Sequence, residues 1–276
     1  MSAANSITFV STVNNRKIFE RNFLASPCFG ENHPYQIIVQ EGFSSAAKAY
    51  NDAIQRSTND LIVFAHQDMV FPENWVEDLG RAIEILDQSD PRWGVLGCYG
   101  ETLDDRGRGH VFSSGLMLGA SFDRPAAVQT LDEIVLIIRK STQLKFDERL
   151  PHFHFYGAEI CMAATKAGRT NYAIPAFCVH NSQMNLVLPK EFYESYRVFK
   201  KIWKAYLPIQ TTCIRVTDSD VPMYRKRLRE VYLRYIRRKT VETVRVDDGR
   251  KLLESLDKSP AIETVPVEQG HGQACR

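Results

Sequence analysis

Short apolar runs alternate with helical patterns along roughly the first hundred residues. Four runs rich in β-branched or other apolar residues are bounded by turn residues, as is typical of buried strands: residues 7–13, 36–40, 61–65 and 93–99. Between them, apolar side chains recur at helical spacing after Ser45 and after Pro72. This alternation predicts an α/β domain whose mixed sheet is mainly parallel and flanked by helices.

The pattern is less regular beyond residue 100. Residues 115–119, 131–138 and 172–179 are predicted strands, and residues 157–167 a helix that ends at Gly168. Aromatic residues at helical spacing then mark a helix that packs on the core: Phe192, Tyr196, Phe199, Trp203 and Tyr206. We therefore assign residues 1–215 to one α/β domain.

The charge of the chain is unevenly distributed. There are 35 basic and 33 acidic residues, a net charge of +2. Residues 225–239 hold eight basic residues and one acid, so they carry +7 and leave −5 for the rest. An apolar stripe runs along the same stretch: Tyr224, Leu228, Val231, Tyr232 and Tyr235. We predict that residues 216–257 form a basic amphipathic helical extension and that residues 258–276 are a disordered tail.

Several protein classes are not expected. The six cysteines contain no C-x-x-C pair, which excludes a zinc ribbon. The first residues do not resemble a secretory leader, and no apolar run approaches the ~20 residues that span a bilayer. We expect a cytoplasmic protein.

Polar side chains follow several of the predicted strands. Thr12 and Asn14 follow the first, Glu41 the second, and His66-Gln67-Asp68 the third. Ligands of open α/β sheets bind at such strand ends. His66 and Asp68 are two residues apart on extended chain and point the same way, so they could hold Mn²⁺ or Mg²⁺. The alternative is a polar loop in which Asp68 accepts backbone hydrogen bonds.

A family resemblance is carried by four segments. LIVFAHQD at residues 61–68 resembles the strand and motif of family-2-like glycosyltransferases with the GT-A (Rossmann-like) fold, in the branch that has H-Q-D where most have D-x-D. Residues 47–51 resemble the helix before that strand, and residues 146–148 (FDE) followed by residues 154–159 (HFYGAE) resemble the acceptor-side motif. Residues 180–182 (HNS) resemble the segment with the distal histidine. The order and spacing of these segments extend over residues 6–185.

The resemblance implies sugar transfer from a nucleotide-diphosphate donor, with a UDP-sugar expected, to a saccharide or lipid-linked saccharide acceptor, with inversion. It implies a divalent cation, Mn²⁺ or Mg²⁺, at Asp68 and His180, with His66 in the place of the usual first aspartate. Glu159 takes the position of the general base. Its alternative role is a favourable interaction with the helix dipole.

The resemblance also implies a set of nucleotide-sugar-binding residues: Thr12, Asn14, Glu41, Asn51, Gln67 and Asp132. Asparagine and threonine at these places equally suit turns and helix caps.

The basic stretch, residues 224–239, has three interpretations. It is a solvated helix that packs its stripe on the domain, an attachment to an anionic membrane surface at the inner face of the membrane, or a nucleic-acid-binding segment. No recognition motif accompanies the charge, so nucleic acid is not expected as a partner. The rivals to an enzyme are a non-catalytic relative that binds nucleotide sugar or glycan, and a protein that docks on a membrane or partner through this helix.

Overall fold

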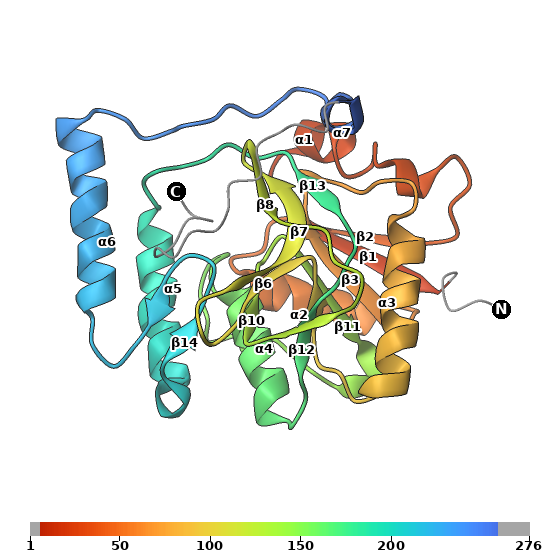
Figure 1. Cartoon of the computed structure of the whole chain (residues 1–276), viewed down its shortest axis with the longest axis horizontal. Helices are drawn as coiled ribbons and strands as arrows, with labels where there is room; N and C mark the ends of the chain where they lie inside the picture. Colours follow the sequence, from red (N-terminus) through yellow and green to blue (C-terminus); the bar gives the residue numbers. More distant parts are fainter. Residues whose placement is uncertain (1–5, 259–276) are drawn as a thin grey trace.

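A seven-stranded mixed sheet forms the centre of the computed structural model, which describes residues 6–258 (Figure 1). The disordered tail predicted at 258–276 lies, from residue 259 on, outside the described residues. The strand order is β2-β1-β3-β11-β5-β12-β9. The strands are β1 (Ile7–Thr12), β2 (Gln36–Gln40), β3 (Leu61–His66), β5 (Leu96–Gly97), β9 (Ala126–Val128), β11 (Val135–Arg139) and β12 (Asn171–Ala173).

Most strands of this sheet run in one direction. β1 pairs in parallel with both β2 and β3, and β12 pairs in parallel with β5. β11 is antiparallel to both β3 and β5, and β9 is antiparallel to β12. The prediction of a mainly parallel mixed sheet is confirmed.

Helices cover both faces of the sheet. The α-helices of the described residues are α1 (Arg16–Arg21), α2 (Ala46–Arg56), α3 (Trp75–Ser89), α4 (Tyr156–Lys166), α5 (Lys190–Ile202), α6 (Val221–Val231) and α7 (Gly249–Lys258), of which α1 to α5 cover this sheet. On one face, Val10 and Phe64 pack with α2, α4 and α5. On the other, Phe9 and Val63 pack with α1 and α3. Burial on both faces explains why β1 and β3 are continuous apolar runs.

A second sheet stands beside the first, in the order β10-β6-β7-β13-β4, with β8 paired to β7. Its strands are β4 (Met69–Val70), β6 (Tyr99–Glu101), β7 (Gly107–Ser113), β8 (Leu116–Gly119), β10 (Thr130–Leu131) and β13 (Cys178–His180). β4 and β13 are antiparallel, with His180 opposite Met69. The distant β13 is thereby brought beside the end of β3.

Three of the predicted strands are corrected. The run at 93–99 divides into β5 and β6, the run at 131–138 into β10 and β11, and the run at 172–179 into β12 and β13. In each case the two parts belong to different sheets. The chain leaves one sheet at Cys98 and at Asp132-Glu133 and enters the other. Apolar periodicity does not encode such a change of partner.

The C-terminal part is less continuous than the predicted helical extension. After the hairpin β14 (Ile209–Gln210) and β15 (Arg215–Val216), α6 continues into a π-helical turn, Tyr232–Ile236. Residues 237–248, here called the strap, then cross the body to α7, which lies beside α1 (Figure 1). Leu253 of α7 is buried with Val70 and Val179.

The apolar stripe of the basic stretch does not pack on the domain. Tyr224, Leu228 and Tyr235 are 59%, 69% and 66% exposed. Val231 and Tyr232 are both 47% exposed. The first of the three interpretations, a solvated helix that packs its apolar stripe on the domain, is therefore wrong about where the stripe lies. Within the described residues, no helix is both long enough and apolar enough to cross a bilayer.

An aromatic cluster around Phe9 offers a test of this core. The fully buried Phe9 ring contacts those of Phe29, Phe71 and Trp75, at centroid distances of 4.9, 5.8 and 6.0 Å. Phe9→Ala should lower the free energy of unfolding by about 3–5 kcal/mol, because the cavity cannot fully collapse. Urea denaturation measures this. Leu103→Ala, at a position 58% exposed, should change it by less than about 0.5 kcal/mol.

Candidate functional site

A cavity of about 430 Å³ opens where β1, β2 and β3 end. It is lined by Thr12, Val13, Asn14, Gln40, Gly42, Phe43, His66, Gln67, Asp68, Phe153 and Tyr156. The carboxyl ends of these parallel strands meet at one edge, as the sequence predicts. We call it the strand-end cavity.

Gln67 ties the turns after β1 and β3 together. Its Oε1 accepts hydrogen bonds from the backbone N–H groups of Asn14 and Asn15, at 3.1 and 3.0 Å. Its Nε2 donates to Asn14 Oδ1 at 2.6 Å. Asn15 Oδ1 also caps α1 by accepting from the Ile18 N–H at 3.2 Å. Asn14 and Gln67 thus shape the rim of the cavity through their contacts with each other.

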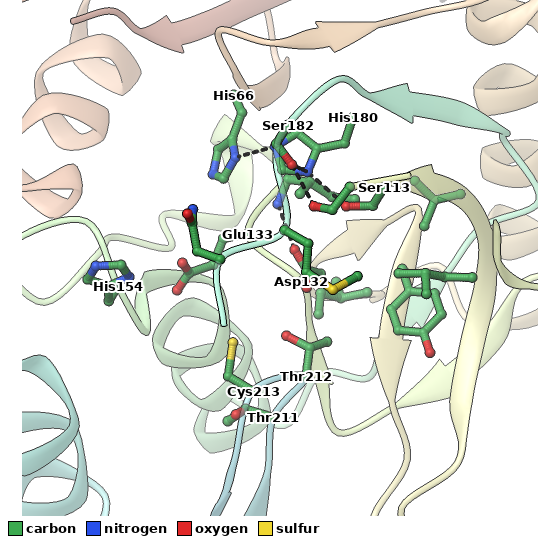
Figure 2. Close-up of a pocket in the computed structure, with 18 of the residues that line it drawn as sticks. His66, Ser113, Asp132, Glu133, His154, His180, Ser182, Thr211, Thr212 and Cys213 are labelled. Carbon is green, nitrogen blue, oxygen red and sulfur yellow. Dashed lines mark hydrogen bonds between the residues drawn. The ribbon is translucent and has the colours of Figure 1, made fainter. Parts of the chain in front are cut away.

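A second cavity, of about 280 Å³, adjoins the first and shares His66 with it (Figure 2). Its polar lining includes His66, Ser113, Asp132, Glu133, His154, His180, Ser182, Thr211 and Thr212. Asp132 and Glu133 lie on its wall below the His66–His180 pair in the view of Figure 2. We call it the carboxylate cavity.

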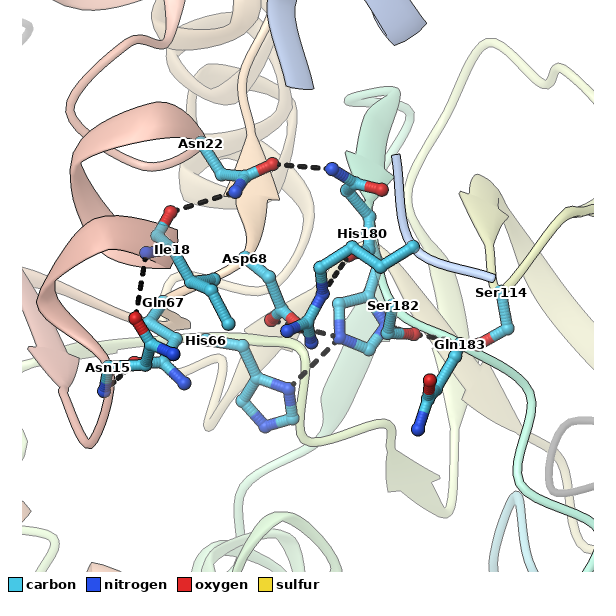
Figure 3. A network of polar contacts seen from close by, with 12 residues as sticks. Asn15, Ile18, Asn22, His66, Gln67, Asp68, Ser114, His180, Ser182 and Gln183 are labelled. Atoms are coloured by element: carbon cyan, nitrogen blue, oxygen red, sulfur yellow. Dashed lines mark hydrogen bonds and ion pairs between the residues drawn. The ribbon is translucent and has the colours of Figure 1, made fainter. Parts of the chain in front are cut away.

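His66, Asp68 and His180 form a compact group at the junction of the two cavities (Figure 3). One ligand atom from each lies within 4.8 Å of the others. His180 Nε2 is 3.3 Å from His66 Nδ1 and 3.2 Å from Asp68 Oδ1. The predicted ligands are therefore brought together by β3, the turn after it, and β13.

Second contacts orient both imidazoles. The Tyr156 hydroxyl donates to the Glu133 carbonyl oxygen at 3.0 Å, so His66 Nε2–H donates to that hydroxyl at 2.8 Å. His66 Nδ1 then presents a lone pair to the group. His180 Nδ1 lies 3.0 Å from Ser113 Oγ and 3.3 Å from Ser182 Oγ, and either hydroxyl oxygen can accept a hydrogen bond from Nδ1–H. Such outer partners are typical of histidines that ligate metals.

The protonation states also suit a cation. Burial, together with the nearby His180, lowers the pKa of His66 to about 4, which keeps it neutral. Burial raises the pKa of Asp68, but attraction by His180, His66 and Arg245 outweighs it and holds the pKa well below its usual value. Two imidazoles and one carboxylate are donors that Mn²⁺ accepts, so the residues fit a divalent cation.

Arg245 is a site residue that the sequence did not reveal. From the strap, its guanidinium forms an ion pair with Asp68 Oδ2, and its Nε donates to the Asn181 carbonyl oxygen at 2.8 Å. Asp68 and Arg245 are 177 residues apart, so no local pattern links them. Ser113 was missed for the same reason, because the pairing of β7 with β13 brings it to His180.

Three predicted site residues lie away from the two cavities or at their rim. Glu41 sits beside Arg16, 3.4 Å away, with both side chains largely exposed. Asn51 binds Phe146 through its amide, with Nδ2 donating to the carbonyl oxygen at 2.9 Å and Oδ1 accepting from the N–H at 3.0 Å. Asn51 therefore holds the segment before α4, and neither it nor Glu159 is among the residues that line the cavities.

The structure does not bring Glu159 to the carboxylate cavity. It is 2% exposed in the first turn of α4, and its Oε2 accepts the Asp147 N–H at 3.1 Å. Burial raises its pKa to about 8. Successive residues of a helix point in different directions. Ala158 lines the cavity, whereas Glu159, the next residue, contacts Asp147 in the 144–150 segment.

Asp132 and Glu133 are the acids of the carboxylate cavity. Burial, and secondly Asp132, raise the pKa of Glu133 well above its usual value, although the backbone N–H groups at the start of α4 oppose this by hydrogen bonding. Asp132 Oδ1 accepts the Ile134 N–H at 3.2 Å. The predicted site residue Asp132 thus reaches a cavity, beside a second acid.

Comparisons with known proteins support a family assignment. Residues 8–203 match the model of a family described as "Glycosyltransferase like family". A protein of Fuscovulum blasticum, described as "ATP synthase subunits region ORF 6", is 31% identical over 133 residues, which is 45% of this chain and 53% of that protein. The chain thus matches about half the length of this relative.

Solved structures are similar at 14% identity. Residues 1–349 of S. aureus TarS give a TM-score of 0.43, over 84% of this chain and 73% of that one. A longer TarS structure gives 0.46, over 82% and 43%. The mannosyltransferase PcManGT of Pyrobaculum calidifontis, in complex with GDP-Man and Mn²⁺, gives 0.43, over 95% and 76%.

The family match confirms the glycosyltransferase resemblance that the H-Q-D segment and its neighbours indicated. The mixed, mainly parallel sheet flanked by helices confirms the predicted α/β architecture. The role of the H-Q-D motif itself stays a prediction.

The buried Glu159 predicts a pH-dependent stability. Its folded pKa of about 8 lies above the ordinary value of 4.5, so the folded chain keeps this proton in a pH range where the unfolded chain loses it. The stability that protonated Glu159 contributes is fully present below about pH 4.5, and it is lost as the pH rises to about 8. The unfolding midpoint temperature of Glu159→Gln should therefore rise relative to that of the wild type as the pH increases from 5 to 8. A constant difference would contradict the raised pKa.

Proposed function

We propose that this chain, which belongs to the glycosyltransferase-like family through its residues 8–203, transfers a sugar from a nucleotide-diphosphate donor to a saccharide hydroxyl. One observation carries the proposal. The strand-end cavity and the carboxylate cavity adjoin at His66, with the His66–Asp68–His180 group at their junction. A donor in one and an acceptor in the other would meet beside that group.

The strand-end cavity suits the nucleoside and diphosphate. Thr12, Asn14 and Gln67 offer a hydroxyl and two amides around it, and Asp68 also lines it. Glu41 stands near its rim, where an acid can accept hydrogen bonds from a ribose. We take a UDP-sugar as the expected donor. Asn51 contributes indirectly by holding the 146–148 segment.

His66, Asp68 and His180 would hold a divalent cation, Mn²⁺ or Mg²⁺. When bound, such an ion offsets the negative charge that develops on the leaving diphosphate. Tyr156 fixes the ring of His66, and Ser113 and Ser182 fix that of His180. These contacts preorganise the ligands before a donor arrives.

We expect a carboxylate that lines the carboxylate cavity to remove the proton from the acceptor hydroxyl. A general base must lie within hydrogen-bond reach of the attacking hydroxyl. Asp132 and Glu133 line this cavity, and the Glu133 carboxylate already hydrogen-bonds the start of α4. Asp132 is therefore our candidate base for an inverting, in-line attack. Glu159, which the resemblance favours, is the alternative.

Three variants test the assignment. Asp132→Asn should lower kcat about 100-fold or more with donor binding retained, because an amide cannot take the proton. Glu159→Gln should keep activity within a few-fold, since its carboxylate contacts Asp147 and not a cavity. Asp68→Ala should abolish metal-dependent turnover. The assay is release of nucleoside diphosphate, with the donor first chosen by thermal-shift screening.

The opposite ranking, with Glu159→Gln inactive and Asp132→Asn active, would return the base to Glu159. Donor binding without turnover towards any saccharide would favour the non-catalytic relative instead.

We further propose that the basic stretch attaches the enzyme to an anionic membrane surface, where a lipid-linked acceptor would lie. The favouring observation is that this stretch leaves its apolar residues in solvent, with Leu228 and Ile236 both 69% exposed, among arginines and lysines. A basic helix with an exposed apolar face binds in this way. The chain would then act as a peripheral protein at the inner face of the membrane.

Vesicle co-sedimentation tests the attachment. The protein should bind vesicles with anionic lipid, bind neutral vesicles weakly, and dissociate at high salt. Replacing Arg225, Arg229 and Arg234 with Gln should weaken binding about 100-fold, at about 1 kcal/mol for each charge. The matched control replaces Arg81, Arg106 and Arg108, exposed residues of the body. Equal losses in both triple variants would leave α6 without this role.

A further inference from the structure

Arg245 places a guanidinium against the carboxylate that a divalent cation would use. It contacts Asp68 Oδ2, while His180 Nε2 lies 3.2 Å from Oδ1. Its Nε donates to the Asn181 carbonyl oxygen at 2.8 Å. Within residues 6–258 these are its hydrogen bonds, so further N–H groups of the guanidinium remain available. Its side chain is 31% exposed. Arg245 is not among the residues that line the strand-end cavity, but it contacts Asp68, which is.

The strap holds Arg245 firmly in this position. The Val246 N–H donates to Asn181 Oδ1 at 3.0 Å, and Asn181 Nδ2 donates to the Val246 carbonyl oxygen at 2.7 Å. On the other side, Thr243 Oγ1 accepts the Met184 N–H at 2.6 Å. Arg245 is therefore an anchored part of the site and not a side chain that happens to reach it.

The contact sets up a competition for one negative charge. The pair of Asp68 and Arg245 is neutral, and both oxygens of Asp68 have partners. A divalent cation that coordinates Asp68 has to displace the guanidinium or share the carboxylate with it. Two positive charges at one buried carboxylate repel each other. The donor diphosphate, in contrast, is attracted by either of them.

We propose that Arg245 is the resident counter-ion of Asp68. It competes with a divalent cation for that carboxylate, and it supplies positive charge to the donor diphosphate when no such cation is bound. The competition depends on geometry alone, whereas the contact with the diphosphate rests on the proposed function. The site then faces the donor with a positive charge in either state.

The competition is tested with Mn²⁺ alone. Electron paramagnetic resonance should show that Arg245→Gln binds Mn²⁺ at least about tenfold more tightly than wild type, because Asp68 loses its competitor. Arg245→Lys keeps the charge and should stay near wild type. Arg21→Ala should also stay near wild type, because it removes another strap contact, the ion pair with Asp247 at 3.0 Å. Equal or weaker Mn²⁺ binding by Arg245→Gln would overturn the competition.

The contact with the diphosphate is tested by calorimetry with UDP. In EDTA, Arg245→Gln should bind UDP at least about tenfold more weakly than wild type, and saturating Mn²⁺ should reduce that difference to less than threefold. Arg245→Lys should recover part of the loss. An equal difference in EDTA and in Mn²⁺, or none, would overturn this half of the inference.

The two failures are distinguishable. If the wild-type chain binds neither UDP nor GDP in either condition, the proposed function fails and takes the diphosphate contact with it. The Mn²⁺ measurement still decides the competition in that case, because it uses no nucleotide.

Discussion

The pairing of β4 with β13 is the contact on which the site depends. Val179 lies opposite Val70 and His180 opposite Met69, and the Asn181 N–H donates to the Asp68 carbonyl oxygen at 2.9 Å. The two imidazoles come from residues 114 apart in the sequence, and this pairing is what brings them side by side in the fold. β13 also runs parallel to β7, so the same strand brings Ser113 to His180. One short ladder thus unites both cavities, the candidate metal ligands and their outer partners.

The predictable part of the fold is the part in which burial is uniform. β1 and β3 are apolar runs because they lie between helices, and such runs can be identified in a sequence. Residues 93–99 and 131–138 were each predicted as one strand because apolar residues predominate in them, yet each passes from one sheet to the other. The stripe of residues 224–235 was predicted correctly as a pattern. Whether such a stripe packs on the domain depends on the rest of the fold and not on the sequence of the helix, and here the stripe is exposed to solvent.

The same distinction holds for the site. The sequence could predict that His66 and Asp68 lie together, because both lie next to one strand end, where spacing fixes geometry. Glu159 had the right residue type near a helix start, but packing decides which face of α4 turns to the cavity. Asp132 was expected at the edge of the site and does line a cavity. Arg245 could not be found, because an ion pair across 177 residues is determined by the path of the strap and not by local sequence.

That separation also sets an order of events during synthesis. At ~5–20 residues per second, Asp68 leaves the ribosome roughly 10–35 seconds before Arg245. Through that interval the strands around Asp68 can assemble, but its guanidinium partner does not yet exist. Leu253, which packs on Val70 and Val179, is made later still. The ion pair between Asp68 and Arg245 therefore cannot form until the strap has been made and has reached the end of β3.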